Sequence, residues 1–128
     1  MTIVGMGTDL IEIDRMRQAL ARRGERLRQR LFTDREIAYC QAKRDPYPHY
    51  AARFAAKEAF FKALGSGWRG GLRWNEVEVV RTEMGKPTLA LAGRVHQWAE
   101  ARGIQEGNVQ LSLTHSRDYA LSTVIIHG

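Results

Sequence analysis

The segment FAAKEAFFKALG, residues 54–65, constrains the fold more than any other part of the chain. Its Ala, Leu, Glu and Lys residues are strong helix formers, and Gly65 suits the position just past a helix C-terminus. Apolar side chains cover most of the circumference, which is the pattern of a helix buried on several sides. We therefore expect a buried helix here, followed by a flexible turn over the glycine-rich residues 65–71.

Glu58 and Lys62 stand one turn apart on this helix and face the same side. One interpretation is a solvated salt bridge between the two side chains on the one exposed face of the helix. The other is a polar cluster in a cleft, where the two charged groups share a ligand. The segment alone is compatible with both interpretations.

The patterns before this helix predict one strand and further short helices. A short apolar stretch with two glycines predicts a strand that ends near Asp9. Helical spacing follows it, and Gly24 is expected to break this region into two helices. Thr33 and Glu36 form a capping-box pattern at the start of another helix. After a linker with two prolines, the central helix is expected to begin near Tyr50.

The second half of the chain changes to strand periodicity. Residues 76–91 alternate on both sides of a turn and predict a hairpin, and residues 93–103 predict a short helix. Residues 108–116 and 118–126 predict a second hairpin. Helices early and antiparallel strands late are typical of the α+β class. We therefore expect residues 1–128 to form a single small domain of helices packed on an antiparallel sheet.

Charge and composition restrict the possible partners and compartments. The net charge is +6 with a pI near 10.0, and residues 15–30 contain seven arginines against one acid, Glu25. Such a segment attracts a nucleic acid, an acidic protein or a membrane surface, and composition is compatible with all three. The longest uncharged runs have ten residues, too few to span a membrane. The single cysteine, Cys40, excludes an internal disulfide and fits a reducing cytoplasm.

Asp9, Glu58, Lys62 and His115 are the polar residues that simple packing does not require. Each has an ordinary explanation: a helix cap for Asp9, a salt bridge for the helix pair, a hydrogen-bonded ring for the histidine. Two carboxylates near a lysine, without a His/Cys cluster, suit Mg²⁺ rather than zinc. A lysine there would face phosphate oxygens. Together these residues indicate magnesium-dependent chemistry on a phosphate ester or anhydride.

Three motifs in this order and spacing resemble the holo-acyl carrier protein synthases, which are 4′-phosphopantetheinyl transferases. The motifs are GTDLIEIDR (7–15), RFAAKEAFFKALGSG (53–67) and SLTHSRDYALSTVI (112–125). The segments FTDREIAYCQ and GKPTLAL also fit, so the resemblance covers nearly the whole chain. Phe61 is bulkier than the family pattern suggests, but no polar site position departs from it.

The resemblance implies transfer of 4′-phosphopantetheine from coenzyme A to a serine of an apo acyl carrier protein, in support of fatty acid biosynthesis. It implies that Asp9 and Glu58 are the Mg²⁺ ligands. Glu58, directly or through a metal-held water, would accept the serine proton, and Lys62 would neutralise the leaving phosphate. The family is similar in forming homotrimers that bind coenzyme A between neighbouring subunits.

The resemblance also implies contacts with the two substrates. The residues implied in coenzyme A binding, besides Lys62, are Arg53, Gly65, Pro87 and His115. The residues expected to dock the acidic carrier protein are Arg15, Arg22 and Arg23. Two of these lie seven residues apart and therefore project from nearly the same side of a helix.

Two other function classes are compatible with parts of the sequence. A nucleic-acid-binding protein would explain the basic pI, but it would leave Asp9 and Glu58 without a role, and the chain has no recognisable reader motif. A trimeric scaffold without catalytic activity would explain the fold alone. A transferase that does not bind nucleic acid or membranes accounts for more of the residues than either alternative.

Overall fold

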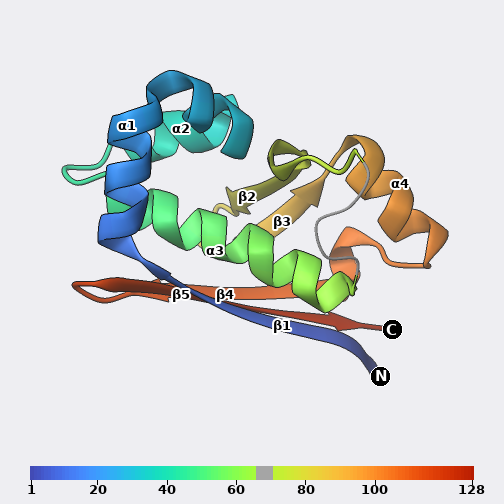
Figure 1. The fold of residues 1–128 in the computed structure, drawn as a ribbon. Coiled ribbons are helices and arrows are strands. Elements are labelled where there is room, and N and C mark those ends of the chain that lie inside the picture. Colours follow the sequence, from blue (N-terminus) through green and yellow to red (C-terminus); the bar gives the residue numbers. More distant parts are fainter. Residues whose placement is uncertain (66–70) are drawn as a thin grey trace.

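The computed structural model of the chain describes residues 1–65 and 71–128, so most of the predicted turn at 65–71 lies outside the described residues. Helices pack on antiparallel strands, which confirms the predicted α+β class (Figure 1). In chain order the elements are β1 (Ile3–Glu12), α1 (Ile13–Leu31), α2 (Asp34–Gln41), α3 (Tyr47–Leu64), the 3₁₀ turn η1 (Trp74–Glu76), β2 (Val77–Arg81), β3 (Pro87–Leu91), α4 (Gly93–Ala101), the 3₁₀ turn η2 (Glu106–Asn108), β4 (Val109–His115) and β5 (Tyr119–His127).

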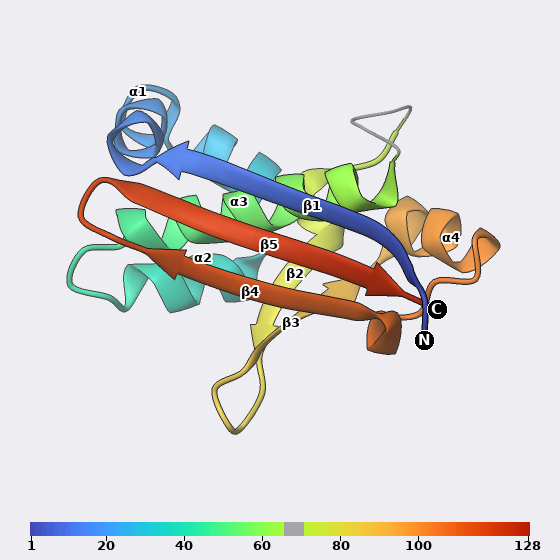
Figure 2. The ribbon, with the colours of Figure 1, turned by 90° about the horizontal axis from the view of Figure 1, so that it is seen from below.

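The main sheet joins the two ends of the chain. Its strand order is β1-β5-β4, and every pair is antiparallel, whereas β2 and β3 form a separate two-stranded sheet. The first strand pairs with the last, and the amide of Gly128 donates a hydrogen bond to the carbonyl of Thr2 (2.8 Å), so the termini lie side by side. One face of the main sheet is covered by α3, and within the described residues no helix covers the other face (Figure 2).

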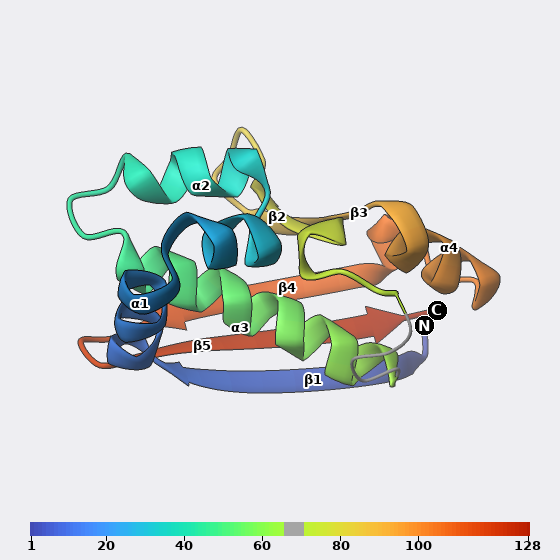
Figure 3. The same cartoon turned by 45° about the horizontal axis from the view of Figure 1, so that its top comes forward.

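Helix α3 lies between two layers, which explains why it is apolar on most of its circumference. The main sheet lies below it in the view of Figure 1, and α1, α2 and the β2–β3 hairpin lie on its other side. Figure 3 shows the same helices and hairpin from a view in which the top of the molecule is turned forward. Residues of α3 belong to both hydrophobic cores: Phe60 packs with Val124 and Val95 in one, and Tyr50 packs with Leu20 in the other. The buried helix predicted from the sequence is therefore confirmed.

Two glycines let β1 lie directly against α3. A Cβ atom on Gly5 would overlap the carbonyl oxygen of Ala63, and one on Gly7 would overlap the carbonyl oxygen of Ala59. Because these obstacles are backbone atoms, no change of side-chain rotamer could make room. The close approach brings Asp9, two residues after the second glycine, beside the helix.

A buried ion pair connects α2, α3 and β2. The ammonium of Lys57 lies 2.6 Å from Oε1 of Glu36, and both side chains are fully buried. Lys57 also donates to the carbonyls of Val77 (2.6 Å) and Trp74 (3.1 Å). Oε2 of Glu36 accepts a hydrogen bond from the amide of Val79 (2.8 Å). Each charge is thus paired and hydrogen-bonded, as a buried charge must be.

Several predicted boundaries are confirmed by backbone geometry. Gly24 has φ 61° and ψ −141° and interrupts α1 where the break was expected. Thr33 and Glu36 form the predicted capping box at the start of α2. Gly65 adopts the left-handed conformation, φ 76°, at the C-terminus of α3. In each case a local rule of backbone conformation decides the boundary.

Two predicted boundaries are wrong. Helix α3 begins at Tyr47 rather than near Tyr50, because prolines are tolerated in the first helical turn, where no amide donor is needed. Strand β1 continues to Glu12 rather than ending near Asp9, because β5 pairs with it as far as Tyr119. Asp9 therefore does not cap α1, whose N-cap residue is Glu12.

Candidate functional site

Asp9, Lys62 and Glu58 come together where β1 lies against α3. The ammonium of Lys62 donates to Oδ1 of Asp9 (2.9 Å) and to the carbonyl of Thr8 (3.0 Å). Within the described residues its ion pair is with Asp9, so the simple salt bridge to Glu58 considered from the sequence is not formed. The Asp9 side chain is 8% exposed, whereas that of Lys62 is 55% exposed. The ammonium is therefore fixed at one side and open to a ligand at the other.

The two carboxylates of this site lie close together, and too few hydrogen-bond donors surround them to satisfy their oxygen atoms. Oδ2 of Asp9 is buried and has no hydrogen-bond partner among the described residues. Burial, and then the neighbouring Asp9 carboxylate, raise the pKa of Glu58 to about 7, although the charge of Lys62 acts in the opposite direction. Two carboxylates so placed need a proton or a cation between them.

A hard divalent cation fits this pair. The described residues contain no group of three or more His, Cys, Asp or Glu side chains that could hold a metal. Mg²⁺, however, typically takes one or two protein carboxylates and fills its other positions with water and substrate phosphate oxygens. Asp9 and Glu58 could supply the carboxylates, and the buried, unpartnered Oδ2 atom is the observation that favours a cation.

The carboxylate pair lines a cavity of about 530 Å³ between α1 and α3. Asp9, Glu58 and Glu12 are its acidic lining residues, and Arg15 of α1 adds a positive charge. The apolar part of the lining includes Met16 and Phe54. The cavity thus offers both charged and apolar contacts to a ligand.

The three arginines predicted to dock a carrier protein lie on the exposed side of α1. Arg15, Arg22 and Arg23 are exposed and precede the break at Gly24. None of the three has a carboxylate partner within the described residues, whereas Arg17 on the same helix pairs with Asp14 and Asp45. Because Arg15 also lines the carboxylate cavity, the basic surface begins at the candidate site.

Arg53 and His115, predicted to bind the coenzyme, lie on the other flank of α3. Nη1 of Arg53 is 3.5 Å from the carbonyl of His49, whose ring lies 5.3 Å from the ring of His115. His115 is carried by β4, two strands from β1 and therefore about 10 Å away across the sheet. Within one chain, the structure does not bring these residues to the carboxylate pair.

The other two predicted coenzyme contacts divide between the same two flanks. Gly65 follows Lys62 at the end of α3, and its amide donates to the Lys62 carbonyl (3.1 Å). Pro87 begins β3, where it pairs with Arg81 of β2. The predicted residues therefore form one group at β1 and the C-terminal part of α3, and another around the β2–β3 hairpin and the end of β4.

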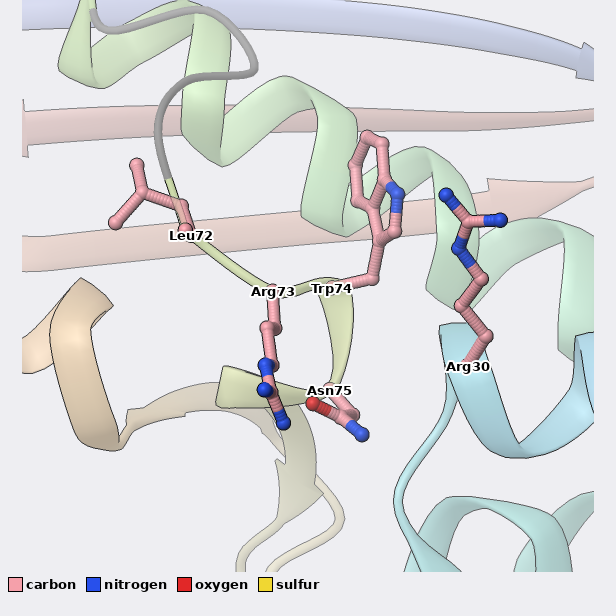
Figure 4. Close-up of a pocket in the computed structure, with 6 residues that line it drawn as sticks. Arg30, Leu72, Arg73, Trp74 and Asn75 are labelled. Atoms are coloured by element: carbon pink, nitrogen blue, oxygen red, sulfur yellow. The ribbon is translucent and has the colours of Figure 1, made fainter.

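A second cavity, of about 380 Å³, lies between the end of α1 and η1 (Figure 4). Arg30, Arg73 and Asn75 line it together with Trp74. Its described lining contains no carboxylate, so it lacks the charged ligands that the pair of Asp9 and Glu58 would offer to a metal. Its lining carries the positive charges of Arg30 and Arg73.

The sequence interpretation missed a group of cations around Tyr39. Arg53 lies 3.9 Å, Lys43 4.6 Å and Arg81 5.7 Å from the centroid of its ring. These residues come from α2, the segment after it, α3 and β2, and no motif or periodicity joins them. Cys40, next to Tyr39, is buried, and burial raises the pKa of its thiol to about 12, as for an inert packing residue.

Comparison with known proteins gives one consistent result. A family model described as the 4′-phosphopantetheinyl transferase superfamily matches residues 5–124. A holo-[acyl-carrier-protein] synthase of Solibacter usitatus is 45% identical over 126 residues, which cover 98% of this chain and 99% of the relative. The crystal structure of the synthase from Neisseria meningitidis superposes with a TM-score of 0.89 at 31% identity, covering 98% of this chain and 99% of that one.

A third similar protein was crystallised with its ligand. The holo-(acyl-carrier-protein) synthase of Bacillus anthracis, in complex with coenzyme A (3′,5′-ADP), superposes with a TM-score of 0.77 at 30% identity. The match covers 98% of this chain and 97% of that one. Fold and sequence similarity thus both extend over nearly the full length. Within the described residues, no helix combines the length and the apolar character that crossing a bilayer requires.

Proposed function

The chain belongs to the holo-acyl carrier protein synthases of the 4′-phosphopantetheinyl transferase superfamily, and we propose that it catalyses the reaction for which these enzymes are named. In this reaction, 4′-phosphopantetheine moves from coenzyme A to a serine of an apo acyl carrier protein, and adenosine 3′,5′-bisphosphate is released. We further propose that residues 1–128 act as one catalytic domain in the cytoplasm and support fatty acid biosynthesis.

The observation that carries this proposal is the incomplete environment of the Asp9 carboxylate. Its Oδ2 atom is buried beside Glu58 without a partner among the described residues, while Lys62 contacts only the other oxygen. A structural salt bridge would not need a second carboxylate at this position. A site for a metal-bound pyrophosphate would need both.

Mg²⁺ is the proposed metal, held by Asp9 and Glu58. When bound to these two carboxylates, it would neutralise negative charge on the pyrophosphate of coenzyme A. Oxygen donors and a pair of acids suit this hard ion better than zinc, which prefers nitrogen and sulfur ligands.

The protein's own groups would then handle the proton and the leaving group. The serine oxygen of the carrier attacks the pantetheine-side phosphorus, and the bond from this phosphorus to the bridging oxygen breaks. Glu58 accepts the serine proton. Lys62, whose ammonium is held by Asp9 but more than half exposed, neutralises the charge on the leaving phosphate.

We propose that the functional assembly is a homotrimer with coenzyme A bound between subunits. The coenzyme contacts predicted at Lys62 and Gly65 lie on one flank of α3, and those at Arg53, Pro87 and His115 on the other. A site shared between neighbouring subunits would allow one coenzyme to contact both groups. The face of the main sheet that no described helix covers (Figure 2) also supports assembly. Its strands β1 and β5 carry the exposed large apolar side chains Val4, Met6, Leu10, Tyr119 and Leu121.

The acidic carrier protein is proposed to dock on the exposed face of α1. The support is the position of Arg15, which both belongs to the basic face and lines the carboxylate cavity. A carrier held by Arg22 and Arg23 would then have its serine near the site of transfer. Electrostatic complementarity of this kind favours fast and selective encounter.

The direct test is the mass of the carrier. The protein is incubated with coenzyme A, Mg²⁺ and an apo carrier, and the carrier is analysed by mass spectrometry. We expect the mass to rise by one phosphopantetheine group, and to stay unchanged for a carrier whose acceptor serine is replaced by alanine. If the carrier gains no mass over a range of carriers, the proposed function is wrong.

A further inference from the structure

Lys57 lies inside the motif that carries Glu58 and Lys62, yet neither the metal site nor the transfer step proposed above uses it. Its side chain is completely buried, on the side of α3 that faces α2 and β2 (Figure 1). A lysine is almost never fully buried unless its charge is paired. The burial of a charge beside the candidate site therefore needs a physical reason.

The Lys57 ammonium uses all three of its donors, and they join α3 to three other elements. The acceptors are Oε1 of Glu36 on α2 (2.6 Å), the carbonyl of Trp74 in η1 (3.1 Å) and the carbonyl of Val77 in β2 (2.6 Å). Glu36 in turn accepts a hydrogen bond from the amide of Val79 (2.8 Å). One point on α3 is thus held by directional bonds to α2, η1 and β2.

Net stability does not explain why Lys57 and Glu36 are charged. Taking two charges out of water costs about as much free energy as their attraction returns, so a well-packed apolar pair is often equally stable. The ion pair and its hydrogen bonds add direction, which apolar contacts lack. Buried polar contacts can in this way select one orientation of a helix among several that apolar packing alone would allow.

The opposite side of α3 determines its distance from β1 more than its rotation. Gly5 and Gly7 lie there against the backbone of Ala63 and Ala59. Glycine facing alanine offers no side chain that could fit into a groove of the neighbouring element. This contact lets the two backbones approach closely, but it resists a rotation of the helix only weakly.

Rotation of α3 matters because Glu58 directly follows Lys57. Consecutive residues lie about 100° apart around a helix axis, so Lys57 reaches β2 while Glu58 lines the cavity. A helix with its side chains has a radius of about 5–6 Å, and a rotation of about 10° therefore moves the end of a side chain by about 1 Å. A displacement of this size at a catalytic group can lower the rate by about a hundredfold.

We propose that Lys57 is a positioning residue: together with Glu36 it fixes the rotation of α3 and thereby the place of Glu58 beside β1. This inference rests on the proposed function, because it takes Asp9 and Glu58 to be the site of transfer. The buried ammonium contacts neither substrate nor the reacting atoms. Its effect is therefore on Mg²⁺ affinity and on the rate of transfer, rather than on recognition of the carrier.

The test removes both charges together, in Glu36→Gln with Lys57→Met, so that no buried charge is left unpaired. Mg²⁺ affinity is measured by calorimetry, and kcat and the KM for the carrier by steady-state kinetics. We expect the Kd for Mg²⁺ to rise about tenfold and kcat to fall about tenfold, because Glu58 is displaced. The KM for the carrier should stay nearly unchanged.

A crystal structure of the metal-free double variant tests the rotation itself. We expect α3 to be rotated about its axis and the distance from Lys62 Nζ to Asp9 Oδ1 to exceed the present 2.9 Å. If this double variant does not fold, Glu36→Gln with Lys57→Gln decides the matter. It keeps a hydrogen-bonding group at both positions but has no ammonium, and it should show the same losses.

Val95→Ala is the matched control for a loss of stability alone. Val95 is fully buried in α4, which carries no residue of the candidate site. Its truncation should lower the melting temperature but leave Mg²⁺ affinity and kcat at their wild-type values. Equal losses of Mg²⁺ affinity and kcat in Val95→Ala would show that they result from lower stability, and would overturn the inference.

The inference is also wrong if a folded double variant keeps wild-type Mg²⁺ affinity and kcat, or if its α3 is not rotated. Neither Mg²⁺ binding nor the crystal structure depends on turnover. Weaker Mg²⁺ binding with a rotated α3 would therefore support the inference even if the wild type transferred nothing to the carrier. Absence of wild-type transfer would contradict the proposed function alone.

Discussion

Lys62 is held by Asp9 and by the Thr8 carbonyl, yet more than half of its side chain is exposed. If it faces the substrate phosphate, Lys62→Met should lower kcat by about a hundredfold or more, as for loss of a transition-state electrostatic contact. Steady-state kinetics with coenzyme A and an apo carrier measure this, and Arg102→Met, which removes an exposed charge near Trp98, is the control. A lower melting temperature with unchanged kcat would show that Lys62 has a structural role only.

Glu58 should make the metal-free protein less stable as the pH rises. Its pKa is raised from 4.5 to about 7 on folding, so the folded state binds this proton more tightly between these values. Stability should therefore decrease from about pH 5 to about pH 8 in the wild type relative to Glu58→Gln. Denaturant unfolding at several pH values measures the difference. Added Mg²⁺ should reverse this trend. If the stability difference between the wild type and Glu58→Gln does not change with pH in the absence of metal, this assignment of Glu58 is wrong.

At the scale of the elements, the contact between β1 and α3 sets the separation of Asp9 from Glu58. Gly7→Ala would place a methyl group against the backbone of Ala59, so β1 would have to move away. We expect a loss of about 1–3 kcal/mol of stability and a higher Mg²⁺ concentration for half-maximal activity. Gly107→Ala, where a Cβ atom has no atom within 4 Å, is the control and should change neither quantity. A normal Mg²⁺ requirement in Gly7→Ala would show that this contact does not position the carboxylates.

The elements that could be predicted from the sequence are those decided by local chemistry. The break at Gly24, the capping box at Thr33 and the left-handed end at Gly65 each follow from nearby residues. The pairing of β1 with β5 could not be predicted, because it joins opposite ends of the chain. The same pairing extends β1 past Asp9, so the end of this strand was predicted too early.

The candidate site could be predicted only in part, because it too depends on contacts between distant parts of the chain. Asp9, Glu58 and Lys62 could be named from the sequence, but the contact of the lysine with β1 depends on the tertiary approach that Gly5 and Gly7 allow. The cations around Tyr39 come from separate elements and left no pattern in the sequence. Their grouping results from packing of α2 and β2 on α3.

For the whole molecule, the basic face of α1 should determine recognition of the carrier. The double substitution Arg22→Glu with Arg23→Glu should raise the KM for the carrier severalfold and leave the KM for coenzyme A nearly unchanged. The effect should weaken at high salt, because exposed charges are screened beyond about 8 Å at physiological ionic strength. Arg94→Glu with Arg102→Glu changes the net charge equally at another place on the exposed surface and is the control. An equal rise in both KM values would show that α1 is not part of the surface that recognises the carrier.

The central claim is that Asp9 and Glu58 form the metal site of a phosphopantetheinyl transferase. The most direct measurement is the rate of carrier modification as Mg²⁺ is titrated, for the wild type, Asp9→Asn and Glu58→Gln, with Mg²⁺ affinity measured in parallel by calorimetry. Each variant removes one charge with little change in volume, so the fold should remain intact while transfer and Mg²⁺ binding are nearly abolished. Near-full activity of either variant at ordinary Mg²⁺ concentrations would contradict the account.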